Sequence, residues 1–186
     1  MVKSIPVHKR KKRGYGISLF LILALLASGF TVFYACGTTV TVDNSSVKEL
    51  DLNRYLGKWY EVARFNHRFE RDMQHCTATY TLQEDGTIKV TNSGMKNGKM
   101  NTSVGKAKIT EVPGVLRVSF FGPFYSDYRV LMLSPDYSYA LVGGSDDDYL
   151  WILSRTPRMA NEDLVKIVNE ARRRGYDTEK LIWVEH

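Results

Sequence analysis

The sequence predicts a mainly β domain in which eight short antiparallel strands run up and down, close into a barrel and precede one helix. Strand-like runs rich in β-branched and aromatic residues follow one another from residue 57 to residue 154. Segments rich in Gly, Pro, Asn and Asp, such as 84–86 and 143–148, separate them. Closing such a meander removes its two exposed edges. The strands are expected at 57–65, 76–83, 87–93, 103–111, 115–121, 127–133, 138–143 and 149–154.

The N-terminal segment has the pattern of a targeting signal. A cluster of cations precedes an apolar stretch at 17–35 that ends at Cys36. Ala35 is the small residue that a lipoprotein signal prefers before its cysteine, and residues 37–46 are mostly small and polar. We therefore divide the chain into a signal peptide (1–35), a lipidated Cys36 with a polar tether (36–50) and a folded domain (51–186). The apolar stretch is also long enough to span a bilayer, so an N-terminal transmembrane anchor stays open.

The net charge of +6 does not indicate a nucleic-acid partner. Residues 1–36 hold six of the 26 Lys and Arg residues and no acid, which leaves 20 basic side chains against 20 acidic ones in 37–186. The folded domain is therefore formally neutral and has no electrostatic footprint for nucleic acid.

The one predicted helix lies near the C-terminus. Asn161 is its expected N-cap, and an apolar stripe at helical spacing runs from Leu164 to Ala171. Three arginines end the helix and Gly175 follows as the expected stop. A short final strand is expected at 181–185.

The first strand, GKWYEVARF at 57–65, has two faces because side chains alternate along a strand. One face carries the cations Lys58 and Arg64, and we expect it to face solvent. The other face is mostly apolar and holds Trp59, Glu61, Ala63 and Phe65.

These motifs together resemble the lipocalin family and, within it, the bacterial lipocalins. The resemblance covers about residues 47–185, and bacterial lipocalins are outer-membrane lipoproteins to which the animal apolipoprotein D is related. Five sequence motifs in the same order carry it: GKWYEVARF, HRFER (67–71), TATY (77–80), VSFFGPFY (118–125) and YLWILSRTP (149–157).

The resemblance implies a barrel that is open at one end, with the helix packed outside. Trp59 would plug the closed end, and Arg155 would lie across its indole in a cation–π contact, so both are expected to be structural. The implied ligands are fatty acids or lysophospholipids. Binding, storing or transporting them would support maintenance of the cell envelope. Because Gly37 is not the Asp that retains lipoproteins in the inner membrane, we expect an outer-membrane location facing the periplasm. A homodimer stays open.

Alternation along the strands predicts which side chains line the barrel, and a register error of one residue would invert any strand. The predicted lining is aliphatic and aromatic with one carboxylate, which suits an acyl chain. The predicted ligand-binding residues are Glu61, Ala63, Phe65, Ala78, Tyr80, Val90, Val118, Phe120, Tyr128, Met132, Tyr149 and Trp151.

Glu61 is the carboxylate of this lining. Burial should raise its pKa unless a partner compensates, and we expect a hydrogen bond to a tyrosine of the lining or to a ligand. The basic residues around the first long loop are either headgroup contacts or ordinary solvated charges: Arg64, His67, Arg68 and Arg71.

An enzyme is the second hypothesis, because a carboxylate beside tyrosines can do acid–base chemistry on a lipid; a ligand-free interaction module is the third. The sequence lacks a nucleophile–base pattern, and its four histidines lack metal-ligand spacing. We therefore expect no catalytic residue, no metal and no cofactor. With Cys36 lipidated, Cys76 has no disulfide partner and is expected to be a small buried residue in a strand.

Overall fold

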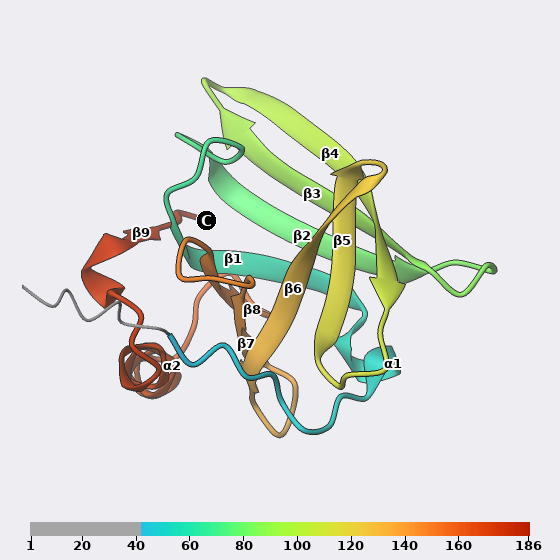
Figure 1. Ribbon diagram of the computed structural model, residues 1–186. Coiled ribbons are helices and arrows are strands. Elements are labelled where there is room, and N and C mark those ends of the chain that lie inside the picture. The colour runs from blue at the N-terminus through green and yellow to red at the C-terminus, as the bar shows by residue number, and fades with distance from the viewer. Residues whose placement is uncertain (1–41) are drawn as a thin grey trace, which may run out of the picture. The chain divides into compact units, whose positions relative to one another are not determined.

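The computed structural model describes residues 42–186, and in this part of the chain antiparallel strands form a closed eight-stranded barrel (Figure 1). Each strand pairs with the next, and β1 pairs with both β8 and β2, which closes the barrel. The predicted fold class is therefore confirmed. The barrel strands are β1 (Gly57–Phe65), β2 (Gln74–Leu82), β3 (Ile88–Lys96), β4 (Lys99–Ile109), β5 (Val115–Phe121), β6 (Phe124–Leu133), β7 (Tyr139–Gly143) and β8 (Leu150–Ser154).

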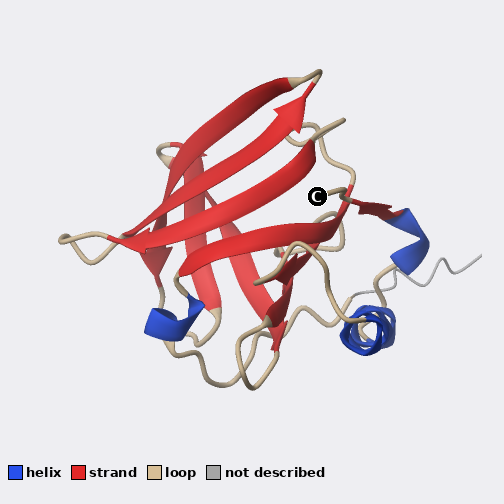
Figure 2. Ribbon diagram, turned by 180° about the vertical axis from the view of Figure 1, so that it is seen from behind, coloured by secondary structure: helices blue, strands red, loops and turns tan. Residues whose placement is uncertain are grey.

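Four further elements flank the barrel. The short helix α1 (Leu52–Tyr55) precedes β1, and the helix α2 (Asn161–Arg173) follows β8 and lies outside the barrel (Figure 2). A 3₁₀ turn η1 (Thr178–Lys180) leads into β9 (Leu181–Trp183), which pairs with the end of β1. Cys36 and the apolar stretch 17–35 lie outside the described residues. Within 42–186 no helix has the length and hydropathy needed to cross a membrane.

The β3–β4 hairpin is longer than the sequence predicts. Its turn consists of Asn97 and Gly98, whose φ angles of 52° and 72° are those of a type I′ turn. Such a turn matches the right-handed twist of the strands, so the ladder continues to the tip, where Lys96 pairs with Lys99. The hairpin therefore includes residues 94–102, which the sequence prediction left outside its strands.

A β-bulge in β1 changes which residues face the interior. The register between β1 and β8 shifts between Glu61 and Ala63, so the strand gains an extra residue there. Glu61 lies before the bulge, on the face that alternation gives to Trp59, and is 5 % exposed. Beyond the bulge Ala63 and Phe65 pack in the outer cluster beneath α2. The prediction that Ala63 and Phe65 line the cavity is therefore wrong, because the bulge inverts the two faces of the strand.

A second bulge has the same effect in β6. The register between β6 and β7 shifts between Val130 and Met132. Val130 packs inside the barrel, whereas Met132 packs against the outer cluster. The prediction for Met132 is wrong for the same physical reason.

Helix α2 covers part of the outer surface of the barrel. Ile167 and Ala171 are its buried residues, and they pack in the cluster that includes Leu141 and Ile152. Ala160 occupies the N-cap position, so Asn161 is the first helical residue rather than the predicted cap. The helix ends before Gly175, whose φ of +90° is the left-handed conformation that a C′ glycine supplies.

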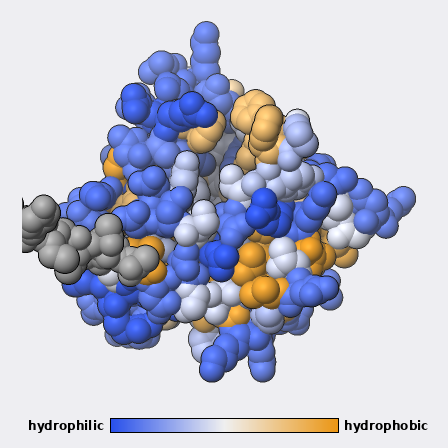
Figure 3. Space-filling view, in the orientation of Figure 1, coloured by the Kyte–Doolittle hydropathy of each residue, from blue (hydrophilic) through white to orange (hydrophobic). Residues whose placement is uncertain are grey.

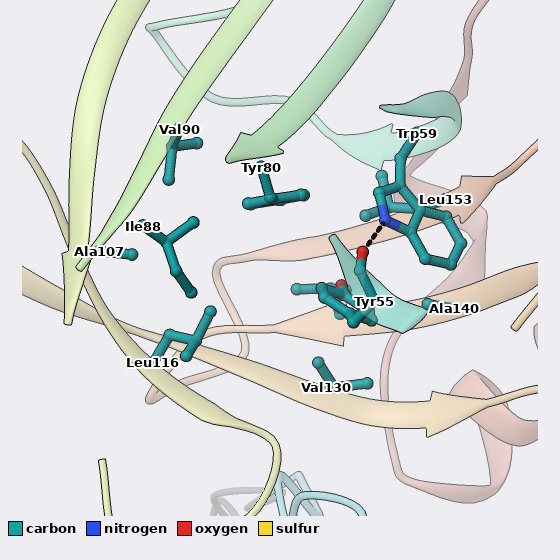
Figure 4. Packing of buried hydrophobic residues seen from close by; sticks show 11 residues of the cluster. Tyr55, Trp59, Tyr80, Ile88, Val90, Ala107, Leu116, Val130, Ala140 and Leu153 are labelled. Carbon is teal, nitrogen blue, oxygen red and sulfur yellow. Dashed lines mark hydrogen bonds between the residues drawn. The ribbon is translucent and has the colours of Figure 1, made fainter. Parts of the chain in front are cut away.

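The closed end of the barrel is fully packed. Tyr55 and Trp59 are 0 % exposed, and the Trp59 Nε1 donates a 2.8 Å hydrogen bond to the Tyr55 carbonyl (Figure 4). The guanidinium of Arg155 lies 3.8 Å from the centre of the Trp59 ring. It also donates hydrogen bonds to backbone carbonyls of Arg54, Tyr55 and Lys58. Arg155 thus ties α1 and β1 together over the indole.

Candidate ligand-binding site in the barrel

The inner surface of the barrel is apolar and partly accessible to solvent. The inner cluster contains most of the residues that the sequence places in the lining: Ala78, Tyr80, Val90, Val118, Phe120, Tyr128 and Trp151. Tyr80 and Val90 are buried, but Ala78, Val118 and Phe120 are only half-buried. Solvent therefore reaches inward-facing side chains above the packed floor.

Three tyrosines form a hydrogen-bonded group on that floor. The hydroxyl of Tyr128 lies 2.5 Å from that of Tyr55 and accepts a 2.9 Å hydrogen bond from that of Tyr80. Burial raises the pKa of all three phenols, so they stay neutral at physiological pH. The three hydroxyls use one another as hydrogen-bond partners. The floor therefore presents mainly aromatic carbon to a ligand bound above it.

Arg64 is the buried cation of the barrel, although the sequence places it on the solvent face. The bulge after Glu61 turns its side chain inward, where it is 1 % exposed. Its Nη1 donates a 2.6 Å hydrogen bond to Oε1 of Glu61. Its Nη2 donates to the backbone carbonyls of Glu70 and Met73 over 2.6 and 3.0 Å. Arg64 therefore fastens the β1–β2 loop, residues 66–73, to the barrel wall.

The carboxylate of Glu70 is a second attachment of this loop. Trp151 donates its indole N–H to Oε2 of Glu70 over 3.2 Å. The same oxygen lies 2.9 Å from Nε2 of His67. Because Trp151 belongs to β8, these contacts join the loop to the strand that neighbours β1.

The two carboxylates of this polar cluster have opposite pKa shifts. Burial, together with the charge of Glu70, raises the pKa of Glu61 to about 8, although Arg64 opposes the shift. Burial also favours the neutral form of Glu70, but His67, Trp151 and Arg64 outweigh it and lower the pKa of Glu70. Near neutral pH Glu61 therefore keeps its proton while Glu70 is ionised and balances Arg64.

Aromatic rings enclose the loop side of the cluster. Tyr149 stacks on Trp151, with ring centres 5.8 Å apart and 16° between the planes. The His67 ring meets the edge of Trp151 at 5.3 Å and lies 5.8 Å from Tyr149. Tyr149 and Trp151, both predicted ligand-binding residues, thus stand where the loop meets the barrel.

Sequence reasoning missed Arg64, His67 and Glu70 as members of one cluster. Glu61 and Arg64 are three residues apart, and regular alternation sends them to opposite faces. A signal was available in the pairing of an inward carboxylate with a nearby cation, because a buried charge requires a partner. It did not reveal the bulge that brings the two together.

A family model of the lipocalin-like domain matches residues 50–186. This chain belongs to the lipocalin family. It is 44% identical over 171 residues to the outer membrane lipoprotein Blc of Escherichia coli K12, covering 90% of this chain and 97% of that protein. It is 32% identical over 184 residues to apolipoprotein D of Mus musculus, covering 89% of this chain and 93% of that protein. Among solved structures, the cockroach allergen Per a 4 aligns with a TM-score of 0.63 at 23% identity, over 76% of this chain and 91% of that chain, and shares the fold.

The open end of the lipocalin barrel carries exposed aromatic residues. Phe121 and Phe124 flank the β5–β6 turn and are 72% and 79% exposed, and Phe69 on the β1–β2 loop is 56% exposed. Hydrophobic side chains are visible near the tip of the β5–β6 hairpin in Figure 3. The exposed cations Arg68 and Arg71 belong to the same end. The rim thus combines apolar rings with positive charge.

Cys76 is a buried free thiol in the lipocalin wall. It is 3 % exposed, and Nη1 of Arg64 lies 3.9 Å from its sulfur. Burial raises the pKa of the thiol to about 12, so it stays protonated and is a poor nucleophile. Among residues 42–186 no group of three or more His, Cys, Asp and Glu side chains is arranged to hold a metal ion.

Proposed function

We propose that this lipocalin binds a fatty acid or a lysophospholipid in its barrel and carries or stores it during maintenance of the cell envelope. The observation that carries the proposal is the apolar inner surface, accessible at Val118 and Phe120 above a sealed aromatic floor. Burying roughly ten methylenes at about 0.8 kcal/mol each corresponds to micromolar affinity.

The structure favours a ligand whose polar group stays near the open end. The two Nη atoms of Arg64 are already engaged by one carboxyl oxygen and two backbone carbonyls. An anionic headgroup would therefore compete with existing contacts if it entered deeply. Arg68 and Arg71 are exposed on the β1–β2 loop and would meet it at the rim. The exposed Phe121 and Phe124 would assist exchange of the lipid with a bilayer surface.

The proposed location is the periplasmic side of the outer membrane, with a lipid attached to Cys36. The relative from Escherichia coli carries the name outer membrane lipoprotein, which supports this assignment. The mass of the mature N-terminus tests it: lipidation predicts a chain that begins at a diacylated Cys36, and Cys36→Ala should abolish the modification. Recovery of an intact 1–36 segment would instead establish the transmembrane anchor.

We propose binding without catalysis. The buried carboxyl group of Glu61 is hydrogen-bonded to Arg64, and the nearby thiol of Cys76 has a pKa of about 12. Neither group is an activated nucleophile. The pure protein should therefore leave a lysophospholipid intact, and turnover that Glu61→Gln abolishes would establish the enzyme instead.

The binding experiment uses full-length protein purified from membranes in detergent. Native mass spectrometry should show a co-purifying lipid, and added lysophospholipid should change the intrinsic fluorescence. Ala78 faces the interior opposite Asn92, so Ala78→Trp should fill accessible space and weaken binding at least tenfold.

Thr79→Trp is the matched control. Thr79 is the next residue of the same strand and points to the other face, so this variant should bind within about twofold of the wild type. Equal binding by both variants would contradict a ligand inside the barrel. A ligand-free mass spectrum together with no fluorescence response would contradict lipid binding altogether.

A further inference from the structure

One edge of the barrel sheet has no partner strand in residues 42–186. β4 pairs with β3 from Lys99 to Ala107, but it pairs with β5 only from Lys106 to Ile109. On the side toward β5, residues 99–104 pair with no strand of the described chain. Figure 1 shows the β3–β4 hairpin extending past the β5–β6 hairpin at the open end.

The geometry of the hairpin decides which backbone groups are free. A two-residue turn makes its flanking residues, Lys96 and Lys99, a hydrogen-bonded pair. Hydrogen-bonded and non-hydrogen-bonded pairs then alternate along the ladder. The N–H and C=O groups of Met100, Thr102 and Val104 therefore point away from β3, toward the free side. Lys106 and Lys108, next in this series, lie in the stretch Lys106–Ile109 that pairs with β5.

This edge lacks the features that prevent edge strands from pairing with a strand of another chain. Edges of natural sheets are usually interrupted by a charge, a proline or a bulge. Residues 100–104 read MNTSV, without charge or proline, and the β3–β4 register runs without a shift. Met100 and Val104 are 63% and 60% exposed on one face of the strand. The segment is thus a strand without a bulge that offers both backbone hydrogen bonds and apolar side chains.

We propose that this edge pairs with the same edge of a second copy of the chain. Antiparallel pairing about a two-fold axis at Thr102 places Met100 opposite Val104 and Asn101 opposite Ser103 of the other copy. Apolar side chains then meet apolar ones, polar side chains meet polar ones, and no like charges face each other. A second copy is favoured over another protein because the edge is complementary to itself in this register. The inference is independent of what the barrel holds.

The register is tested by disulfide formation in isolated membranes. Thr102 is the residue that faces itself, at a Cα separation of about 5.5 Å that a disulfide can span. Oxidation of full-length Thr102→Cys should therefore give a covalent species of twice the chain mass on a non-reducing gel. Met100→Cys is the matched control, because its counterpart lies about 13 Å away along the strand and is out of reach. Cross-linking of both variants, or of neither, above the wild-type background would overturn the proposal.

A second experiment removes the hydrogen bonds at the axis. Thr102→Pro deletes an N–H that points to the free side and leaves the β3–β4 ladder intact, whereas Thr102→Val keeps the N–H. A tagged copy should retain an untagged copy from membranes for the wild type and for Thr102→Val, and lose at least nine-tenths of it for Thr102→Pro. Undiminished retention by a folded Thr102→Pro would contradict strand pairing at this edge.

Discussion

Arg64 Nη1 donates a 2.6 Å hydrogen bond to Oε1 of Glu61, and both side chains lie inside the barrel wall. The two residues share a face only because a bulge separates them in β1. The same guanidinium holds two carbonyls of the β1–β2 loop. A local irregularity of one strand thus builds the contact between the barrel and the loop at its open end.

Replacing Arg64 should strongly destabilise the fold. Arg64→Met leaves the part-buried carbonyls of Glu70 and Met73 without their donor and the Glu70 carboxylate without its balancing charge. We expect a loss of about 3–5 kcal/mol in the free energy of unfolding, measured by urea denaturation. Arg68→Met, on the exposed part of the same loop, should stay within about 0.5 kcal/mol of the wild type. Similar losses for both variants would mean that the buried contacts are not the cause.

The stability of the protein should fall as the pH rises from about 5 to about 8. The pKa of Glu61 rises from 4.5 to about 8 on folding, so the folded state binds more protons than the unfolded state across this window. The resulting stabilisation is complete below pH 4.5 and is lost as the pH rises through 8. Its slope is at most about 1.4 kcal/mol per pH unit.

Glu61→Gln isolates this contribution, because the amide oxygen can still accept from Arg64 but cannot ionise. As the pH rises from 5 to 8, the free energy of unfolding of the wild type should fall relative to that of the variant. Glu84→Gln, exposed on the β2–β3 turn, serves as the control and should leave the wild-type slope in place. If the free energies of unfolding of the wild type and Glu61→Gln differ by the same amount from pH 5 to pH 8, the raised pKa of Glu61 is ruled out.

Much of the fold was predictable because it depends on local signals. Turn residues and alternating apolar runs placed β1 and β5 at their observed bounds and located the other strands within a few residues. The hairpin around Asn97 and Gly98 was underestimated, since residues 99–104 have no apolar alternation that burial would impose. The helix α1 was missed because four residues are too short for a periodic signal.

The face on which each side chain of the site lies was predictable only where no bulge interrupts the strand. Tyr80, Val90 and Val118 lie in stretches whose register with the neighbouring strand is continuous, so alternation assigned them to the interior. Beyond a bulge the same alternation gives the opposite answer, which explains the errors at Ala63, Phe65 and Met132. A bulge depends on the register between two strands, and a single sequence does not encode that register locally.

The three tryptophans should report separately on ligand binding. Trp151 stands between the polar cluster and the inner lining, Trp59 is sealed in the floor, and Trp183 is 50% exposed on β9. Trp151→Phe should therefore remove most of the fluorescence change caused by lysophospholipid. Trp183→Phe should retain most of that change. A response that disappears with Trp183 instead would place the ligand outside the barrel.

Arg155 should stabilise the closed end through its shape as well as its charge. Its guanidinium covers Trp59 and donates to carbonyls of α1 and β1, whereas a lysine ammonium cannot reach all of these acceptors from one position. We expect Arg155→Ala to lower the free energy of unfolding by about 2–4 kcal/mol, and Arg155→Lys to recover about half of that loss. Urea denaturation measures both variants, and the exposed Arg158→Ala is the control. Wild-type stability in Arg155→Lys would show that positive charge over the indole is sufficient and that the hydrogen bonds to the carbonyls add little.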